Sequence, residues 1–225
     1  MTYSIAISTV DRPYRQEFFE RLAVTGTLAH PLVKGFHVSY DRGPNESAHH
    51  AMKAAAGDQS DFIIFLEDDI DILNDFVSSI DSWMQDVLDP HIHVYPLGCG
   101  AQRALRRART TGHTSWRWPL KDYFGTCGLV MRREDALDFI YVYETLPELY
   151  PAEKQWMVRW NCMDVNLREW HRRIEPEQTY LVTPTTCFIQ HQGVVSSLST
   201  EPSHWTGTFQ NWQGRDFIYG AGPTA

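Results

Sequence analysis

Short apolar runs alternate with amphipathic stretches along the chain. Runs of strand length lie at 4–9, 35–40, 62–66, 92–97, 127–131, 180–183 and 187–190. Apolar side chains recur at helical spacing over residues 14–24, 45–56, 74–88, 134–143 and 164–173. The run 62–66 is apolar at every position, which is typical of a central parallel strand buried on both faces. The alternation predicts an α/β fold with a mainly parallel central sheet flanked by helices.

The chain has 225 residues, and no linker-like stretch separates two parts of it. We therefore expect one domain over residues 1–225. The segment 98–125 reads as an irregular, basic connection, and a tail rich in Trp, Gly and Gln begins at 203. A connection of that length is usually functional or mobile.

The overall charge argues against a protein that coats nucleic acid. Twenty Lys and Arg against 28 Asp and Glu give a formal net charge of −8. The charge is unevenly spread, because residues 90–121 contain no acid and hold six basic side chains. This strip is either a site for an anionic partner or a solvated loop, and both interpretations stay open.

Targeting and redox signals are sparse. No apolar stretch is long enough to cross a membrane, and no basic region and cleavage site mark a signal peptide. The four cysteines form no CxxC pair and have no zinc-finger spacing. We expect a cytoplasmic protein that does not bind a membrane.

The sharpest feature is the acidic run Glu67, Asp68 and Asp69, directly after the strand predicted at 62–66. In open α/β sheets, ligands bind beyond the carboxyl ends of the strands. Acids this close repel one another and favour a divalent cation, and Mg²⁺ and Mn²⁺ prefer oxygen ligands. The alternative is that the acids only open the next turn, but we favour the metal site. Asp71, farther along the run, is expected to be peripheral.

A histidine follows the predicted strand at 187–190. His191 begins the run HQGVVSSL, which supplies an imidazole, a glycine and two hydroxyl groups that suit a metal and a phosphate. A hydrogen-bonded histidine at a strand end is the alternative, and the spacing alone does not decide between them.

The runs FLEDD and QHQGVVSSL together resemble the GT-A glycosyltransferases, and the second is similar to the corresponding segment of N-acetylglucosaminyltransferase-IV-type enzymes. The resemblance implies a GT-A domain with a DxD-type motif and a nucleotide-sugar donor, most simply a UDP-sugar. It implies that Asp69 and His191 bind Mn²⁺ or Mg²⁺, while Glu67 and Asp68 face the donor. A phage or bacterial hexosyltransferase, in the host cytoplasm if phage-encoded, fits best.

The resemblance also gives roles to other positions around the donor. The expected donor-binding residues are Thr9, Asp11, Arg12, Asp41, Asn45 and Gly128. Asp11 and Asp41 are equally suited to turn formation. Gly128 allows the backbone to approach the sugar, or else reflects a packing requirement.

An inverting transferase needs a carboxylate to take the proton from the acceptor hydroxyl, and Asp164 is the candidate base. An ordinary acid at a helix N-terminus is the competing interpretation. We expect the acceptor to be hydroxymethylated pyrimidine in duplex DNA, which the acid-free basic strip slightly favours, or else a glycan or small molecule. The expected acceptor-binding residues are Arg103, Arg106, Arg107, Trp116 and Trp118.

Two other classes compete with a glycosyltransferase. A nucleotidyltransferase would normally show a glycine-rich phosphate loop, and the chain has none near its first strand. A non-catalytic nucleotide-sugar-binding protein would need the same donor site but no base.

Overall fold

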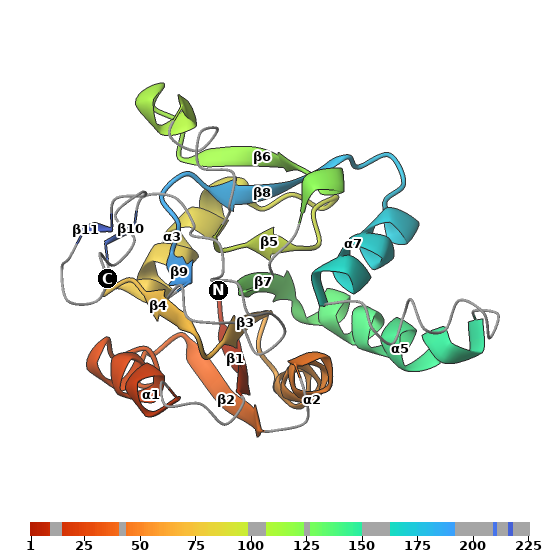
Figure 1. The fold of residues 1–225 in the computed structure, drawn as a ribbon, viewed down its shortest axis with the longest axis horizontal. Coiled ribbons are helices and arrows are strands. Elements are labelled where there is room, and N and C mark those ends of the chain that lie inside the picture. The colour runs from red at the N-terminus through yellow and green to blue at the C-terminus, as the bar shows by residue number, and fades with distance from the viewer. Residues whose placement is uncertain are drawn as a thin grey trace, which may run out of the picture.

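The computed structural model describes residues 1–9, 15–40, 44–98, 107–123, 127–149, 163–191, 209–210 and 216–217. Its main sheet has the strand order β2-β1-β3-β7-β5 (Figure 1). These strands are β1 (Tyr3–Thr9), β2 (Val33–Tyr40), β3 (Phe62–Glu67), β5 (Tyr95–Pro96) and β7 (Gly128–Arg132). The expected strand at 92–97 is thus realised over only two residues.

The sheet is mainly parallel, as predicted. Strand β1 pairs in parallel with β2 on one side and β3 on the other. Strand β7 runs antiparallel to both β3 and β5, so the other four strands share one direction. After β1 the chain moves outward to β2 and then crosses back to β3 on the far side of β1. The carboxyl ends of β1 and β3 therefore flank a topological switch point.

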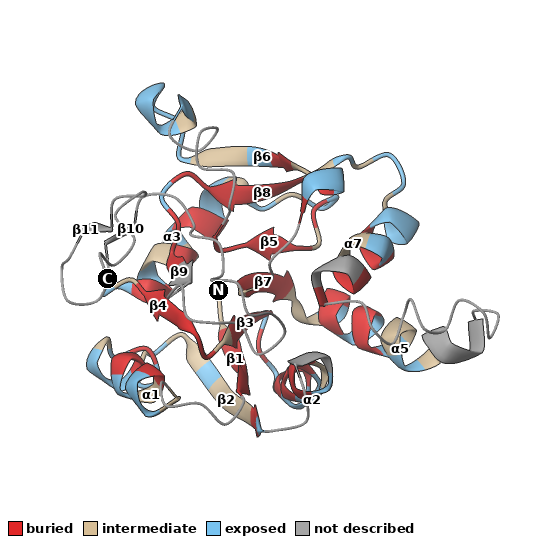
Figure 2. Cartoon of the chain, viewed as in Figure 1, coloured by how far each residue is buried: buried red, intermediate tan, exposed pale blue. Residues whose placement is uncertain are grey.

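Helices cover both faces of the sheet (Figure 1). They are α1 (Arg15–Val24), α2 (Pro44–Ala56), α3 (Phe76–Val87), α5 (Arg133–Leu149) and α7 (Met163–Ile174). Alternate residues of β3 enter different cores, since Ile63 packs in the cluster with α2 and α5, and Ile64 in the cluster with α1 and α3. Residues 62–66 of β3 are accordingly all buried, as the red colour of the central strands in Figure 2 shows, which confirms the prediction for this run.

Two antiparallel strand pairs stand beside the main sheet. Strand β6 (Ser115–Pro119) pairs with β8 (Tyr180–Pro184), and β4 (Ile70–Ile72) pairs with β9 (Ile189–His191). The predicted irregular segment 98–125 therefore contains a strand, which the sequence analysis missed. A 3₁₀ turn follows at Leu120–Asp122, and the tail holds the short pair β10 (Phe209–Gln210) and β11 (Asp216–Phe217).

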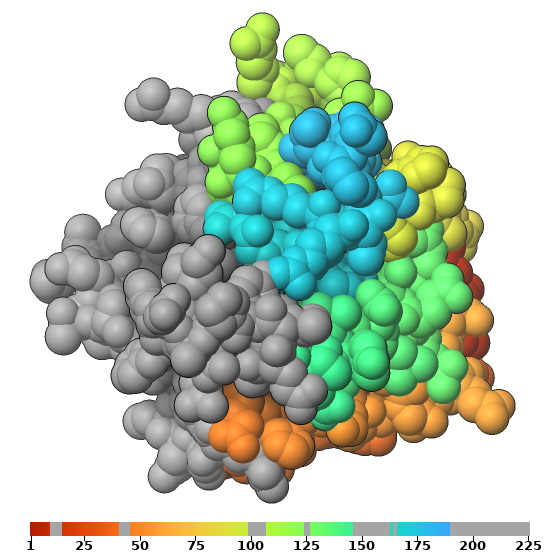
Figure 3. All heavy atoms as spheres, turned by 90° about the vertical axis from the view of Figure 1, so that its right-hand side faces the viewer, coloured from red at the N-terminus to blue at the C-terminus, as the bar shows by residue number. Residues whose placement is uncertain are grey.

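Helices α5 and α7 lie side by side on one face of the molecule, above α2 (Figure 3). The Trp170 indole of α7 donates a hydrogen bond to Asp138 of α5 at 2.8 Å, which ties the two helices together. Among the described residues, no helix combines the length and the apolar character that a bilayer span requires.

Candidate active site

The switch point between β1 and β3 carries the predicted acids. Strand β1 ends at Thr9 and β3 ends at Glu67, so the turn that contains Asp68 and Asp69 begins beside the end of β1. Asp68 is 1% exposed and Asp69 is 4% exposed, while Glu67 is only partly buried. Two carboxylates buried side by side are costly unless cations or hydrogen-bond donors face them.

A hydrogen-bond relay holds Asp68. The Arg15 Nε donates to Thr9 Oγ1 at 2.9 Å, and Thr9 Oγ1 lies 2.5 Å from Asp68 Oδ2. A guanidinium group can only donate, so the hydroxyl accepts from Arg15 and gives its own proton to the carboxylate. Asp68 therefore receives a hydrogen bond that is polarised by a cation and is fixed in direction.

Arg15 also reaches the end of the neighbouring strand. Its guanidinium lies 5.1 Å from the ring centroid of Tyr40, the last residue of β2, and that side chain is about half exposed. The ends of β2, β1 and β3 are thus joined through one side chain of α1. The sequence analysis singled out neither Arg15 nor Tyr40. The sequence showed only that an arginine lies at the start of a predicted helix and that an aromatic residue ends a predicted strand.

The pairing of β4 with β9 brings His191 to the acidic run. Ile70, the residue after Asp69, stands opposite His191 in the antiparallel register, although the two are far apart in sequence. Opposed residues in such pairs have Cα atoms roughly 4.5–5.5 Å apart. The backbone therefore brings the two expected metal ligands to neighbouring positions, while the His191 side chain lies outside the described residues.

Asp71 has a structural partner. It forms an ion pair at 3.1 Å with Arg21 of α1, which is fully buried and also donates to the Ile70 carbonyl at 2.8 Å. Burial lowers the pKa of Arg21, and the carboxylates of Asp71 and Glu17 act in the opposite direction. Asp71 anchors β4 to α1, which agrees with the peripheral role expected for it.

The side chains at this edge of the sheet suit a hard divalent cation. Carboxylate oxygens with an added imidazole are ligands that Mn²⁺ accepts, and Mg²⁺ is commonly held by one or two carboxylates. Among the described residues alone, no group of three or more His, Cys, Asp or Glu could hold a metal ion. His191, whose side chain lies outside that set, is the candidate for a further ligand beside Asp69.

Gly128 is explained by packing. A Cβ atom added there would lie 2.8 Å from Ile189 Cδ1 and 3.1 Å from Leu66 Cδ2. The residue is buried at the start of β7, where any side chain would meet the core. This geometry supports the packing alternative and argues against the expected contact of Gly128 with a donor.

Asp164 is the second residue of α7. Its neighbours Met163 and Asn166 line a small cavity with His49 of α2, so this end of α7 faces α2. The side chain of Asp164 lies outside the described residues, and its role as a base stays a prediction.

The remaining expected residues divide into three groups. Asp11, Arg12, Asp41, Arg103 and Arg106 lie outside the described residues, as does the side chain of Asn45. Arg107 is exposed and Trp116 is partly buried. Trp118 is 1% exposed and packs edge-on against Tyr123, with ring centroids 5.2 Å apart, which argues against its expected contact with an acceptor.

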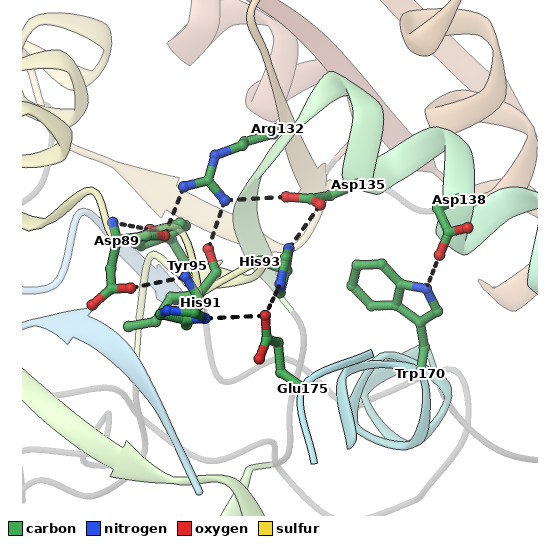
Figure 4. Close-up of polar contacts among 10 residues, drawn as sticks. Asp89, His91, His93, Tyr95, Arg132, Asp135, Asp138, Trp170 and Glu175 are labelled. Atoms are coloured by element: carbon green, nitrogen blue, oxygen red, sulfur yellow. Dashed lines mark hydrogen bonds and ion pairs between the residues drawn. The ribbon is translucent and has the colours of Figure 1, made fainter. Parts of the chain in front are cut away.

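A second polar cluster lies at the opposite edge of the sheet, near Arg132 at the end of β7 (Figure 4). His93 Nδ1 lies 2.8 Å from Asp135 Oδ1, and its Nε2 lies 3.5 Å from Glu175 Oε1. Arg132 lies 3.4 Å from the other oxygen of Asp135. The cluster joins the loop before β5 to α5 and to the end of α7.

No family model matches the chain, and no curated protein matches it. Solved structures do match. One is a glycosyltransferase involved in the glycosylation of the major capsid of PBCV-1, with a TM-score of 0.41, 12% identity, and coverage of 82% of this chain and 94% of that chain. Another is a Drosophila beta-1,4-galactosyltransferase 7 mutant in complex with manganese, UDP-Gal and xylobiose, with a TM-score of 0.44, 13% identity, and coverage of 85% and 71%. At these values the function must be inferred from the chain's own residues.

Proposed function

We propose that this chain is a divalent-metal-dependent glycosyltransferase that moves a sugar from a nucleoside diphosphate donor to a hydroxyl acceptor. The observation that supports this most is the pair of buried carboxylates, Asp68 and Asp69, at the switch point between β1 and β3. That edge of an open α/β sheet is where nucleotide ligands bind.

Asp69 and His191 would hold Mn²⁺ or Mg²⁺ in this proposal. When bound, such an ion supplies Lewis-acid stabilisation of the charge that develops on a leaving diphosphate. The support comes from the register of β4 and β9, which pairs Ile70 with His191.

Asp68 and Glu67 would face the donor sugar or ribose. The hydrogen bond from Thr9 orients the Asp68 carboxylate, so that it can accept a hydrogen bond from a hydroxyl group of the donor in a fixed direction. Thr9 thereby acts through Asp68. Asp11, Arg12, Asp41 and Asn45 remain proposed contacts of the nucleoside.

Asp164 would take the proton from the acceptor hydroxyl as that oxygen attacks the anomeric carbon, which inverts its configuration. The bond from the sugar to the diphosphate breaks as the new glycosidic bond forms.

We favour a glycan or other hydroxyl compound as the acceptor over modified DNA. The formal net charge of −8 disfavours a DNA partner, and the burial of Trp118 removes one aromatic side chain expected to stack on an extruded base. Arg107 and Trp116 remain candidates for acceptor contacts.

The test is release of nucleoside diphosphate from UDP- and GDP-sugars, with Mn²⁺ and with EDTA. We expect release to need the metal and to fall by at least roughly 100-fold in Asp69→Asn, because even indirect supports of a metal site commonly contribute 10–100-fold. Asp75→Asn is the matched control, since Asp75 is an exposed acid shortly after β4. Equal release by both variants, or release unaffected by EDTA, would contradict the proposal.

A further inference from the structure

A groove of about 620 Å³ lies between α3 and the strand pair β6–β8, outside the acidic run. One wall comes from α3, where Ser78, Ser79 and Ser82 line the groove. The facing wall comes from the turn before β6 and from residues 184–186, which begin at the last residue of β8. Trp83 and Phe188 are the buried aromatic members of the lining and therefore form its base.

Hydrogen bonds hold the groove together without a ligand. The Trp83 indole donates to Ser115 Oγ at 2.9 Å, which ties α3 to the start of β6. The Thr185 hydroxyl donates to the His113 carbonyl at 2.7 Å, and the Thr185 amide donates to the Thr114 carbonyl at 2.9 Å. The first bond joins the two walls and the other two hold the facing wall together, as expected of a largely pre-formed binding site.

The lining suits a neutral carbohydrate. Six of its thirteen residues carry hydroxyl groups, although that of Thr185 is buried and donates to the His113 carbonyl, and that of Ser78 lies 3.0 Å from His30 Nε2. A hydroxyl group can exchange hydrogen bonds with sugar hydroxyls as both donor and acceptor. The rings of Trp83 and Phe188, with centroids 5.5 Å apart, supply an apolar base for the C–H faces of a sugar. Arg109 and Asp86 carry opposite charges, so the lining gives no strong attraction to a polyanion.

The backbone of β9 connects the lining of the groove to the candidate active site. Phe188 directly precedes β9 and stands three residues before His191. At a strand rise of about 3.3 Å per residue, its backbone lies roughly 10 Å from that of His191. The Leu73 amide, just after β4, donates to the Phe188 carbonyl at 3.2 Å, so the β4–β9 pair connects the groove to the acidic run.

We infer that this groove binds a neutral oligosaccharide and holds the part of a glycan acceptor that lies away from the reacting hydroxyl. The role as an acceptor subsite rests on the proposed function, whereas binding of the oligosaccharide does not. The expected contacts are hydrogen bonds to Ser79 and Ser82 and apolar contact with Trp83.

Saturation-transfer difference NMR and calorimetry with a panel of neutral oligosaccharides test the inference. Ser82→Trp places an indole in the groove at an exposed position of α3, and Gln85→Trp places one on the same helix outside the lining. We expect wild-type binding in the Gln85 variant and binding at least about tenfold weaker in the Ser82 variant. A ligand-dependent shift of the Trp83 indole resonance, assigned with Trp83→Phe, is expected as well.

Three results would overturn the inference: no binding of any neutral oligosaccharide, equal binding by the two tryptophan variants, or displacement of the oligosaccharide by hydroxymethylated duplex DNA. Donor hydrolysis without acceptor, compared between wild type and Asp69→Asn, tests the proposed function separately. Metal-dependent hydrolysis without oligosaccharide binding removes the groove inference alone. Groove-dependent binding with no hydrolysis removes the proposed function and leaves a carbohydrate-binding site.

Discussion

Acidification should weaken the fold through one buried histidine, His171 of α7. Its side chain is fully buried, and among the described residues neither ring nitrogen has a hydrogen-bond partner. Its ring centroid lies 5.6 Å from that of His93, in the polar cluster at the edge opposite the candidate active site. Burial, and then repulsion from protonated His93, lowers the pKa of His171 to about 4.

The sign follows from linkage between protonation and folding. The pKa of His171 is lower in the folded protein than its ordinary value of 6.5, so the unfolded chain binds the proton more tightly. The stability associated with neutral His171 is therefore present above pH 6.5 and is lost as the pH falls toward 4. At about 1.4 kcal/mol per pKa unit, the loss reaches roughly 2 kcal/mol at pH 5.

His93 acts in the opposite direction. The hydrogen bond to Asp135, with help from Glu175, raises its pKa against the effects of burial and of Arg132. Protonated His93 therefore stabilises the fold below its ordinary pKa, and this contribution is lost as the pH rises through the raised value. The wild-type protein should consequently lose less stability than His171 alone predicts, so a difference between variants is the informative quantity.

Urea unfolding at pH 7 and pH 5 measures that difference. His171→Leu keeps the volume similar and removes the titrating ring, so the variant should lose about 2 kcal/mol less on acidification than wild type. His50→Leu, at an exposed position of α2, should behave as wild type in this comparison. Equal losses in wild type and the His171 variant, or an NMR titration midpoint of His171 near 6.5, would refute the reasoning.

Two further substitutions test the side chains that position the acidic run. Thr9→Val removes the hydroxyl that donates to Asp68 and should weaken UDP binding in the presence of Mn²⁺ by about 10–100-fold. Thr9→Ser keeps a hydroxyl group and should restore the binding that calorimetry measures. Absence of this recovery would argue against the relay. Arg21→Met leaves Asp71 buried without its cation and should lower the free energy of unfolding, measured with urea, by about 3–5 kcal/mol. Adding Asp71→Asn should restore much of that free energy. A double variant no more stable than Arg21→Met alone would contradict the pairing.

The sequence pattern predicted the strands and helices that a continuous apolar run or a regular apolar spacing marks. Strand β3 was predicted at 62–66 and spans Phe62–Glu67, and helix α1 was predicted at 14–24 and spans Arg15–Val24. Strands β4 and β6 were missed because neither contains a continuous apolar run: β4 is the three-residue segment IDI, and β6 is the segment SWRWP, which contains a charged residue between its two tryptophans. The burial of Trp118 was missed as well, since it depends on the pairing of β6 with β8 and on Tyr123.

The candidate site was predictable in kind but incompletely in detail. Acids directly after an apolar strand indicated a ligand-binding edge, because that inference depends only on neighbouring residues. The relay from Arg15 through Thr9 could not be predicted, since it depends on how α1 packs against the ends of β1 and β2. The packing role of Gly128 likewise depends on Ile189, which approaches β7 only in the folded chain.

The acids of one short run acquire different roles because different elements meet them. Helix α1 brings Arg21 to Asp71, which makes that carboxylate part of the scaffold of β4. Strand β1 brings Thr9 to Asp68, which fixes the direction of a carboxylate at the switch point. Asp69 lies between these two anchored acids. The residue after it, Ile70, pairs with His191 of β9, so a histidine from a distant segment comes close to Asp69. If Asp69 and His191 hold a metal ion as proposed, the site is assembled only when β4 pairs with β9, so metal binding should depend on the fold as well as on the acids.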